Sequence, residues 1–318
     1  MVRSIETNFR AGDDELAGTL TLPDADGRHP WVLLVPSWLP RDRDGDWDRV
    51  GHPAWFAPAA GRSHLLARLA NALAVRGAAS LRYDKRGCGR SDGTWQTASL
   101  FALIDDARDA VGAMRSRDDL DLRRTGILGH GEGATVALSV AIGDPAIGAL
   151  TMIGAPARSL RDVMRRGAAI RSRTGVDREH PIVDAIDRSL EELVERAERR
   201  EVAMPLSVGP ERIELGLAGW EQAIHTPPRA LATMLHRSVT LVHGADDAWA
   251  HADESRLLAS ALEAGDNAPS RWLEAGAGHE LAELDDARIG SIADDLAARL
   301  EPRELPPVLL AIEDAGTG

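Results

Sequence analysis

The chain contains 318 residues, of which 44% are hydrophobic, and it carries a formal net charge of −13 from 50 acidic and 37 basic side chains. This length and apolar content suffice for one large α/β domain with an inserted subdomain, or for two domains. The negative charge disfavours nucleic acids and anionic membranes as partners, because both bind to a concentrated positive surface.

The N-terminal segment and the cysteine content bear on where the protein resides. Residues 1–7 lack the apolar stretch of a signal peptide, and no part of the sequence approaches the length of a membrane span. Cys88 is the only cysteine, so no intrachain disulfide can form. We expect a cytoplasmic protein in a reducing environment.

The first half of the chain alternates between predicted strands and helices. Two segments of alternating polarity, 4–10 and 16–22, predict a hairpin of half-buried edge strands. The apolar run 31–35 predicts a strand buried on both faces, and a Pro- and Gly-rich loop follows it to residue 61. Further strands are expected at 78–83, 124–128, 149–153, 238–242 and 270–273, and helices at 65–76, 103–117, 133–142, 253–263 and 286–300. This alternation is typical of a mainly parallel sheet covered by helices.

The alternation of strands and helices stops between residues 156 and 237. This segment contains helical stretches such as 182–200, many charged residues and interrupting prolines, and we find no strand pattern in it. We expect a helical insertion there, after which the strand and helix pattern resumes.

The segment 125–136 has the layout of a strand, a sharp turn and a helix. Apolar residues precede a glycine-rich turn, and an Ala/Val/Leu run with helical spacing follows it. Gly129 and Gly133 occupy the two small positions of the nucleophile-elbow pattern G-x-S-x-G, in which the central serine attacks the substrate. The central residue here is Gly131, which has no side chain that could attack.

Six motifs occur in the order found in the α/β-hydrolase superfamily. They are GTLTLP at 18–23, DRDG at 42–45, LRYDKRGCGRSDG at 81–93, GHGEG at 129–133, HGADD at 243–247 and GH at 278–279. In detail the chain resembles esterase and peptidase-like hydrolases that carry a G-H-S-E-G elbow. The resemblance implies an α/β fold with a doubly wound, mostly parallel sheet. It also implies a core domain of residues 1–155 and 238–318, with an inserted helical cap at 156–237.

The resemblance assigns the catalytic triad positions to Gly131, Asp247 and His279. Asp247 would orient the imidazole and stabilise its cation, and His279 would act as the base. We expect the Asp247 carboxylate to hydrogen-bond one ring nitrogen of His279, with the other nitrogen facing the space above Gly131. Because Gly131 cannot form an acyl-enzyme, covalent chemistry at this position is excluded.

A second group of residues is expected to bind the oxyanion and the substrate. The loop after the third predicted strand begins with Pro36-Ser37-Trp38-Leu39, where the family has His-Gly followed by small residues. In the family, a backbone N–H of this loop is one of the two that bind the oxyanion. The other N–H comes from Glu132, at the start of a helix that favours anions, and the Glu132 side chain is either a catalytic acid or a helix N-terminal carboxylate. The candidate oxyanion and substrate-binding residues are Ser37, Trp38, Leu39, His130 and Glu132.

Other side chains near these motifs have two interpretations each. Ser37 is also a candidate replacement for the missing nucleophile. Cys88 could take that role, but a small buried apolar residue is the better interpretation. The aromatic residues of the long loop either line a pocket for an apolar substrate or belong to the core; they are Trp38, Trp47, Trp55 and Phe56.

Three functions fit these residues. The favoured one is an enzyme that uses His279 as a general base, together with an oxyanion hole and without a covalent intermediate. Its reaction would be elimination, isomerisation, cyclisation or water-mediated hydrolysis of a small apolar carbonyl compound. The second is an ordinary serine esterase, lactonase or amidase seen as an inactive Ser-to-Gly variant, which Gly131→Ser would restore. The third is a non-catalytic binder of a small ligand. We expect a small-molecule partner, no cofactor and no metal, and the oligomeric state is left open.

Overall fold

The computed structural model describes residues 2–49, 55, 62–176 and 180–305. Its central element is an eight-stranded sheet with the strand order β1-β2-β4-β3-β5-β6-β9-β10. The strands are β1 (Arg3–Ala11), β2 (Asp14–Leu22), β3 (His29–Val35), β4 (Ala79–Tyr83), β5 (Leu120–His130), β6 (Ile147–Ile153), β9 (Ser238–Gly244) and β10 (Ser270–Glu274). From β4 to β10, neighbouring strands run parallel. The predicted α/β fold with a mostly parallel sheet is confirmed.

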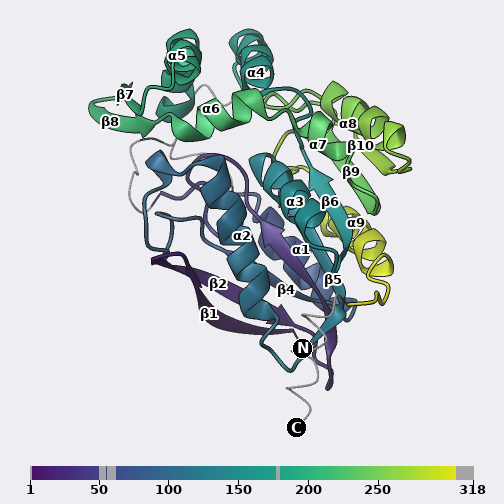
Figure 1. Ribbon diagram of the computed structural model, residues 1–318. Helices are drawn as coiled ribbons and strands as arrows, with labels where there is room; N and C mark the ends of the chain where they lie inside the picture. The colour runs from purple at the N-terminus through teal and green to yellow at the C-terminus, as the bar shows by residue number, and fades with distance from the viewer. Residues whose placement is uncertain (1, 50–54, 56–61, 177–179, 306–318) are drawn as a thin grey trace.

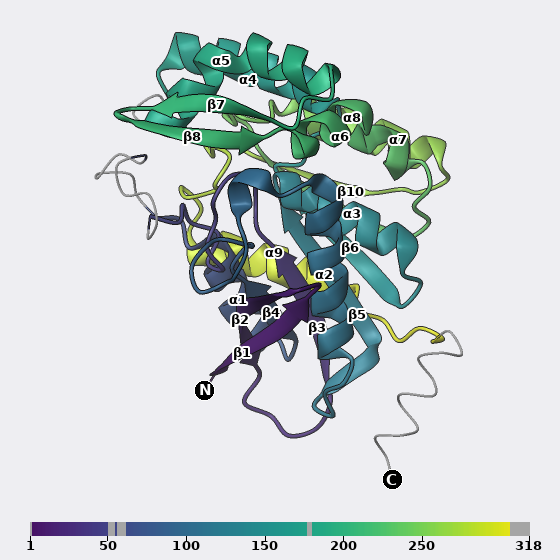
Figure 2. The same cartoon turned by 60° about the vertical axis from the view of Figure 1, so that its left-hand side comes forward.

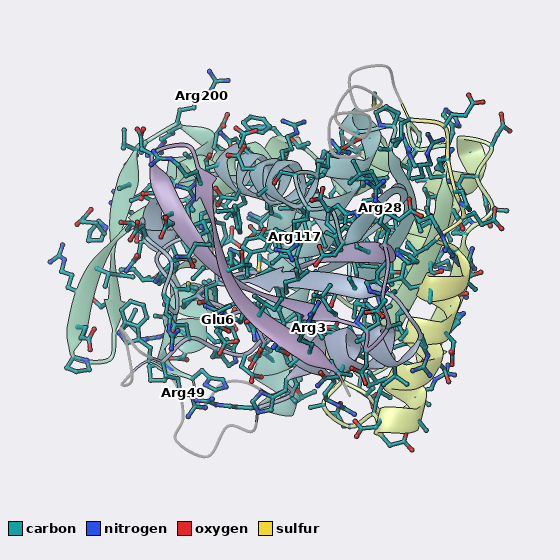
Figure 3. The ribbon with its side chains drawn as sticks, turned by 90° about the horizontal axis from the view of Figure 1, so that it is seen from below. Arg3, Glu6, Arg28, Arg49, Arg117 and Arg200 are labelled. Carbon is teal, nitrogen blue, oxygen red and sulfur yellow. The ribbon has the colours of Figure 1, made fainter. Side chains whose placement is uncertain are left out.

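The N-terminal hairpin differs in part from the two half-buried edge strands that the sequence predicts. β1 lies at the edge and pairs antiparallel with β2, which in turn pairs antiparallel with β4. Residues 16–22 of β2 are all buried, because this strand lies inside the sheet. Figure 3 views this end of the molecule from below, where β1 crosses in purple with Arg3 and Glu6 labelled. The edge assignment was correct for β1 and wrong for β2.

Helices cover both faces of the sheet (Figure 1). One face carries α1 (Leu65–Val75) and α9 (Asp286–Ala298), and the other carries α2 (Leu100–Met114), α3 (Glu132–Gly143) and α8 (Asp253–Ala264). Leu66, Leu69 and Leu73 recur on α1 at helical spacing and join the apolar core beneath it. Each face therefore has its own apolar core, separated from the other by the sheet.

Side-chain caps explain where two of these helices begin. Ser99 Oγ accepts a hydrogen bond from the backbone N–H of Ala102 at 3.0 Å, so α2 begins at Leu100, three residues before the predicted start. Asp285 accepts a hydrogen bond from the N–H of Arg288 at 2.8 Å and caps α9 at its predicted start. In the part of the chain that the structure describes, no helix combines the length and apolar composition needed to cross a membrane.

Residues 156–237 form a layer that contains strands as well as helices. Its elements are α4 (Leu160–Thr174), α5 (Pro181–Glu198), β7 (Ala203–Val208), β8 (Glu211–Gly216), α6 (Ala218–His225) and α7 (Pro228–Ala232). The expectation of a purely helical insertion was wrong, because β7 and β8 form an antiparallel hairpin. Met204, Leu206 and Val208 are buried and alternate with less buried residues, which is the strand signal that the prediction missed.

The inserted segment lies above the carboxyl ends of the parallel strands, as the two views in Figure 1 and Figure 2 show. An apolar cluster joins it to the loop that follows β3. Trp47 and Trp55 of that loop pack in this cluster with Leu193 and Leu217 of the inserted segment. Its division from the core as a separate cap domain stays a prediction.

Candidate functional site

Three loops bring the predicted triad positions to one edge of the sheet. Gly131 directly follows β5, Asp247 follows β9, and His279 follows β10. These are the carboxyl ends of parallel strands, which is where ligands bind in open α/β sheets. The inserted segment covers this edge (Figure 2).

Gly131 forms the sharp turn between β5 and α3. Its backbone has φ 55° and ψ −120°, a conformation that residues with side chains rarely adopt. The flanking glycines permit close backbone packing. A Cβ atom on Gly129 would lie closer than 3.0 Å to the backbone of Gly133, and one on Gly133 would lie equally close to the carbonyl oxygens of Val35 and Pro36. The backbone thus has the geometry of a nucleophile elbow, although the side chain is absent.

Asp247 and His279 form a buried, hydrogen-bonded pair. Nδ1 of His279 lies 2.7 Å from Oδ2 of Asp247, so the expected hydrogen bond is present. The other carboxylate oxygen accepts hydrogen bonds from the backbone N–H groups of Trp249 and Ala250, at 2.7 Å and 2.9 Å. Nε2 of His243 lies 3.3 Å from Asp247 Oδ2. These contacts fix the carboxylate and, through it, the orientation of the His279 ring.

The interaction between these two residues shifts both pKa values. Burial favours the neutral form of Asp247, but the charge of His279 and the hydrogen bonds from His243 and His279 outweigh it and lower the pKa of Asp247. Burial also favours the neutral form of His279, but the Asp247 carboxylate outweighs it and raises the pKa of His279 above its ordinary value of 6.5. The carboxylate stays ionised and strengthens the imidazole as a proton acceptor, which suits a general base.

Gly154, just after β6, leaves space for this pair. Its φ is 55°, and a Cβ atom on it would lie 3.0 Å from both Cε1 and Nδ1 of His279 and 3.4 Å from Oδ2 of Asp247. Gly154 was not among the predicted site residues. A single glycine after an apolar strand carries no signal that it contacts a histidine far away in the chain.

Ser37 and His279 share the space that a side chain at position 131 would occupy. A Cβ atom on Gly131 would lie closer than 3.0 Å to Ser37 Oγ, 3.0 Å from His279 Nε2 and 3.2 Å from Ser37 Cβ. The ring nitrogen that is not bonded to Asp247 therefore faces the space above Gly131, as expected. The Ser37 hydroxyl reaches the same space from the loop after β3.

Lys85 holds the Ser37 loop against the start of α3. It is the only lysine of the chain and is buried. Its Nζ donates a hydrogen bond to the Ser37 carbonyl oxygen at 3.0 Å and lies 3.2 Å from Glu132 Oε2. This ion pair occupies the Glu132 carboxylate, and a role for that carboxylate as a catalytic acid stays a prediction. Lys85 was not among the predicted site residues, because one lysine in a glycine-rich loop has no spacing that marks it.

Two backbone N–H groups belong to residues that line the same space. One is in Trp38, which follows Ser37, and the other is in Glu132, which follows Gly131. Neither group donates a hydrogen bond to an acceptor in the described part of the chain. The N–H of Glu132 also lies at the N-terminus of α3, where the helix dipole favours negative charge. Both groups are available to an oxyanion, and that role stays a prediction.

Two predicted binding residues do not line the cavity that contains Ser37 and His279. Leu39 is buried and borders a separate, smaller cavity. His130 is completely buried, its Nε2 lies 2.9 Å from the carbonyl oxygen of His279, and burial lowers its pKa to about 4. Their assignment to oxyanion or substrate binding stays a prediction, and in the structure His130 supports the backbone of His279.

His130, His279 and Glu280 lie close enough to be considered as metal ligands, the one such group within the described ranges. However, Glu280 Oε1 accepts a hydrogen bond from Arg41 at 2.6 Å, and Nδ1 of His279 is bonded to Asp247. Burial opposes ionisation of Glu280, but the Arg41 guanidinium outweighs it and lowers the pKa of Glu280. Arg41 balances the charge of Glu280, whereas His130 Nδ1 and Glu280 Oε2 have no hydrogen-bond partner among the described residues. The expectation that no metal binds here stays a prediction.

An apolar cavity opens above Ser37, Gly131 and His279. It contains about 710 Å³ of empty space, part of which is open to solvent. Apolar side chains from the loop after β3, from α4 and from the loop after Asp247 form its walls; they include Trp38, Trp47, Leu160, Val163, Met164 and Trp249. A cavity with this lining suits an apolar or aromatic group on a small molecule.

The predicted aromatic residues divide between this cavity and the core. Trp38 and Trp47 line the cavity, whereas Trp55 is fully buried and packs edge-on against another tryptophan. Phe56 lies outside the described residues. Trp249 was not predicted, although its position two residues after Asp247 is a signal that could have identified it. Its ring lies 6.0 Å from that of Trp38, at a steep angle.

The loop 84–93 has the structural role that the sequence favours. Asp84 accepts hydrogen bonds from the backbone N–H groups of Arg43 and Arg90 and forms an ion pair with the Arg43 side chain at 2.7 Å. Cys88 is buried, and burial raises the pKa of its thiol to about 12. A thiol with this pKa is not a substitute nucleophile, because the thiolate is the reactive form.

Arg171 connects the inserted segment to the loop that carries the acid. It is fully buried on α4 and donates hydrogen bonds to Asp187 of α5 at 2.9 Å and to the carbonyl oxygen of Ala248 at 3.0 Å. Its guanidinium carbon lies 4.2 Å from the centre of the Trp249 ring. Arg171 therefore positions the two residues that directly follow Asp247.

Comparison with known protein families agrees with this geometry. Residues 59–283 match the family described as serine aminopeptidase, S33. The chain belongs to the S33 family. The match includes the elbow, the acid loop and the histidine, and it confirms the predicted membership of the α/β-hydrolase superfamily. Within the S33 family this chain is a hydrolase-type enzyme whose elbow carries glycine. No curated protein sequence matches it.

Several solved structures share the fold of this S33-family chain over most of its length. Est1E from Butyrivibrio proteoclasticus, with ferulic acid bound, is 14% identical with a TM-score of 0.63, and the alignment covers 92% of this chain and 99% of Est1E. DcsB, in complex with its substrate analogue, is 15% identical with a TM-score of 0.63, covering 94% and 98% of the two chains. An esterase from Pyrococcus furiosus is 14% identical with a TM-score of 0.63, covering 93% and 91%. At these identities the likeness shows the fold alone.

Proposed function

We propose that this S33-family protein hydrolyses a carboxylic ester, or a related lactone or amide, of a small apolar acyl group. The observation that carries the proposal is the Asp247–His279 pair, whose free ring nitrogen faces the space above Gly131. Family membership favours hydrolysis over the elimination, isomerisation or cyclisation that a glycine elbow also allows. The ordinary hydrolase among the three functions is thus better supported than the non-hydrolytic enzyme.

The proposed reaction uses His279 as the proton acceptor and donor. The acyl carbonyl carbon lies above Gly131, and Nε2 of His279 takes a proton from the attacking oxygen and later gives it to the leaving group. Asp247 stabilises the imidazolium that forms. The N–H groups of Trp38 and Glu132 stabilise the negative charge that develops on the carbonyl oxygen.

The lining of the cavity supports a neutral, apolar substrate. Both arginines that line it are already paired, Arg41 with Glu280 and Arg158 with Glu254. A substrate carboxylate would have to compete with these pairs, whereas an apolar acyl chain or aromatic ring is favoured by the tryptophan walls. We assign the segment 156–237 the role of a cap, because α4 supplies part of the wall.

Hydrolysis of a series of p-nitrophenyl esters tests this function, with acyl groups from acetyl to octanoyl and with benzoyl. His279→Ala should lower kcat/KM by about 100-fold or more, the usual contribution of a general base. His236→Ala is the matched control, since His236 is exposed and does not line the cavity, and it should retain the wild-type rate. Equal rates for wild type and His279→Ala would contradict the proposal. Binding of such esters without any turnover would favour the non-catalytic binder.

A further inference from the structure

Ser37 supplies a hydroxyl to the space where the elbow has no side chain. A Cβ atom on Gly131 would lie closer than 3.0 Å to Ser37 Oγ, so a serine at position 131 would have to displace the Ser37 side chain. In the family pattern that the sequence resembles, serine stands at the elbow and glycine in the loop after the third strand. In this chain glycine stands at position 131 and serine at position 37, and the Ser37 hydroxyl adjoins the position of a residue-131 Cβ atom.

The surroundings of the Ser37 hydroxyl suit a nucleophile. Ser37 lines the cavity although the residue is only 2% exposed. Its Oγ makes no hydrogen bond, with His279 or with any other residue, within the part of the chain that the structure describes. No structural partner occupies it, and the hydrogen bond to His279 has to form when the substrate binds. The free nitrogen of His279 lies 3.0 Å from the Cβ position of residue 131, which the Ser37 hydroxyl adjoins. Lys85 fixes the backbone at this point through the Ser37 carbonyl oxygen.

Other candidate nucleophiles near the site are less suitable than Ser37. The Glu132 carboxylate is paired with Lys85, and Cys88 is buried away from the cavity. Thr135 also lines the cavity, but the three atoms nearest to the position of a residue-131 side chain all belong to Ser37 and His279. The geometry singles out Ser37.

We propose that Ser37 is the nucleophile of this protein and that it forms an acyl-enzyme from the loop after β3. The proposal rests on the hydrolytic function proposed above and names the attacking atom. It also removes the need for a water as the first nucleophile, which a glycine elbow otherwise requires.

The reaction proceeds in two balanced steps. Ser37 Oγ attacks the acyl carbonyl carbon while its proton passes to Nε2 of His279, and the alcohol then leaves with that proton, so Ser37 is esterified. In the second step His279 takes a proton from water, whose oxygen attacks the Ser37 ester. The carboxylic acid leaves and the proton returns to Ser37 Oγ.

Labelling with an alkyl fluorophosphonate tests the nucleophile without knowledge of the substrate. The attacking serine oxygen bonds to phosphorus and fluoride leaves, so the intact mass increases by one phosphonyl group and peptide mapping locates it. The wild-type protein should be labelled at Ser37, and Ser37→Ala should not be labelled. Ser207→Ala is the matched control, because Ser207 is an exposed residue of β7, and it should be labelled like the wild type. His279→Ala keeps the hydroxyl and should be labelled about 100-fold more slowly or worse.

The outcomes separate this inference from the proposed function. Ester hydrolysis without labelling, together with a Ser37→Ala variant that hydrolyses at the wild-type rate, would overturn Ser37 as the nucleophile and leave the hydrolase standing. Labelling at Ser37 without turnover of any ester, lactone or amide would support the nucleophile and reject the substrate class. A label on another serine would also overturn the inference. Circular dichroism of each variant verifies that the fold is retained, and His279→Ala provides the second test if Ser37→Ala does not fold.

Discussion

Nδ1 of His279 lies 2.7 Å from Oδ2 of Asp247, and the two residues come from loops that follow the neighbouring strands β9 and β10. The pairing of these two strands therefore holds His279 beside Asp247. The Asp247 carboxylate raises the proton affinity of the His279 ring. Since a base must be neutral to accept a proton, and Asp247 raises the pKa of His279 against the effect of burial, this contact moves the working range of the site to higher pH.

Activity should fall as the pH is lowered through the raised pKa of His279. The acidic limb of the kcat/KM profile for ester hydrolysis is therefore expected above pH 6.5, because Asp247 raises this pKa above that value. Asp247→Asn removes the charge, so the limb should move to lower pH and the plateau should fall by about 100- to 10,000-fold. Asp246→Asn, at the exposed neighbouring position, is the control. An unshifted limb in Asp247→Asn would show that another group is titrating.

Exchanging the residues at positions 37 and 131 should move the nucleophile back to the elbow. Gly131→Ser alone places a side chain against Ser37 at a φ of 55°, so we expect slower turnover and a loss of about 1–3 kcal/mol in stability. Ser37→Gly alone should be inactive. The double variant relieves the overlap, and it should regain hydrolysis with the fluorophosphonate label on residue 131. A vigorous esterase from Gly131→Ser alone, labelled at 131, would show that Ser37 is dispensable.

Gly154→Ala should lower kcat/KM by more than its backbone strain alone would, because the new side chain also contacts His279. The new Cβ would lie 3.0 Å from the His279 ring, and the φ of 55° adds strain of about 1–3 kcal/mol. Gly12→Ala is a matched control, since Gly12 has a similar φ of 62° but no atom within 4 Å of its Cβ position. Both variants should lose stability in urea unfolding, but only Gly154→Ala should lose kcat/KM. Equal kcat/KM for the two variants would contradict a role for Gly154 beside His279.

Arg171→Ala should lower the stability of the fold, and it should also loosen the loop that carries Asp247 and thereby lower activity. The substitution leaves Asp187 without its buried partner and frees the Ala248 carbonyl, and breaking a buried pair costs about 3–5 kcal/mol. Arg165→Ala, on the same helix, removes an exposed ion pair and should change little. Thermal unfolding and ester hydrolysis at a temperature where both variants are folded measure the two effects. A stable Arg171→Ala variant with full activity would show that the cap does not position Asp247.

Most of the sheet could be predicted from the sequence, because buried parallel strands are continuous apolar runs and amphipathic helices repeat every three to four residues. The prediction failed where tertiary placement overrides the local pattern. The alternation in 16–22 suggests a solvent-exposed face, yet β2 is buried inside the sheet. The hairpin of β7 and β8 was not predicted, because charged residues and prolines interrupt the apolar pattern of that segment.

The site could be predicted only where a motif marks it. Asp247 and His279 were found because each lies in a short family motif at a strand end, and Gly131 because its neighbours define the elbow. Lys85, Gly154 and Arg171 act through contacts between segments far apart in the chain, and neither spacing nor composition records such contacts. The overlap between Ser37 and the side-chain position of residue 131 could not be predicted either, because it depends on how closely two loops approach in the folded chain.

The burial of Lys85 also makes its amine a built-in chemical probe for opening of the loops around the cavity. This side chain carries the single lysine amine of the sequence, and its ammonium group is enclosed between the Ser37 carbonyl and Glu132. Reagents that acylate lysine should leave it untouched in the folded protein and modify it once the loops around the cavity separate. The rate at which this one amine is modified would measure the local opening of the active-site loops, at a position where no probe has to be introduced.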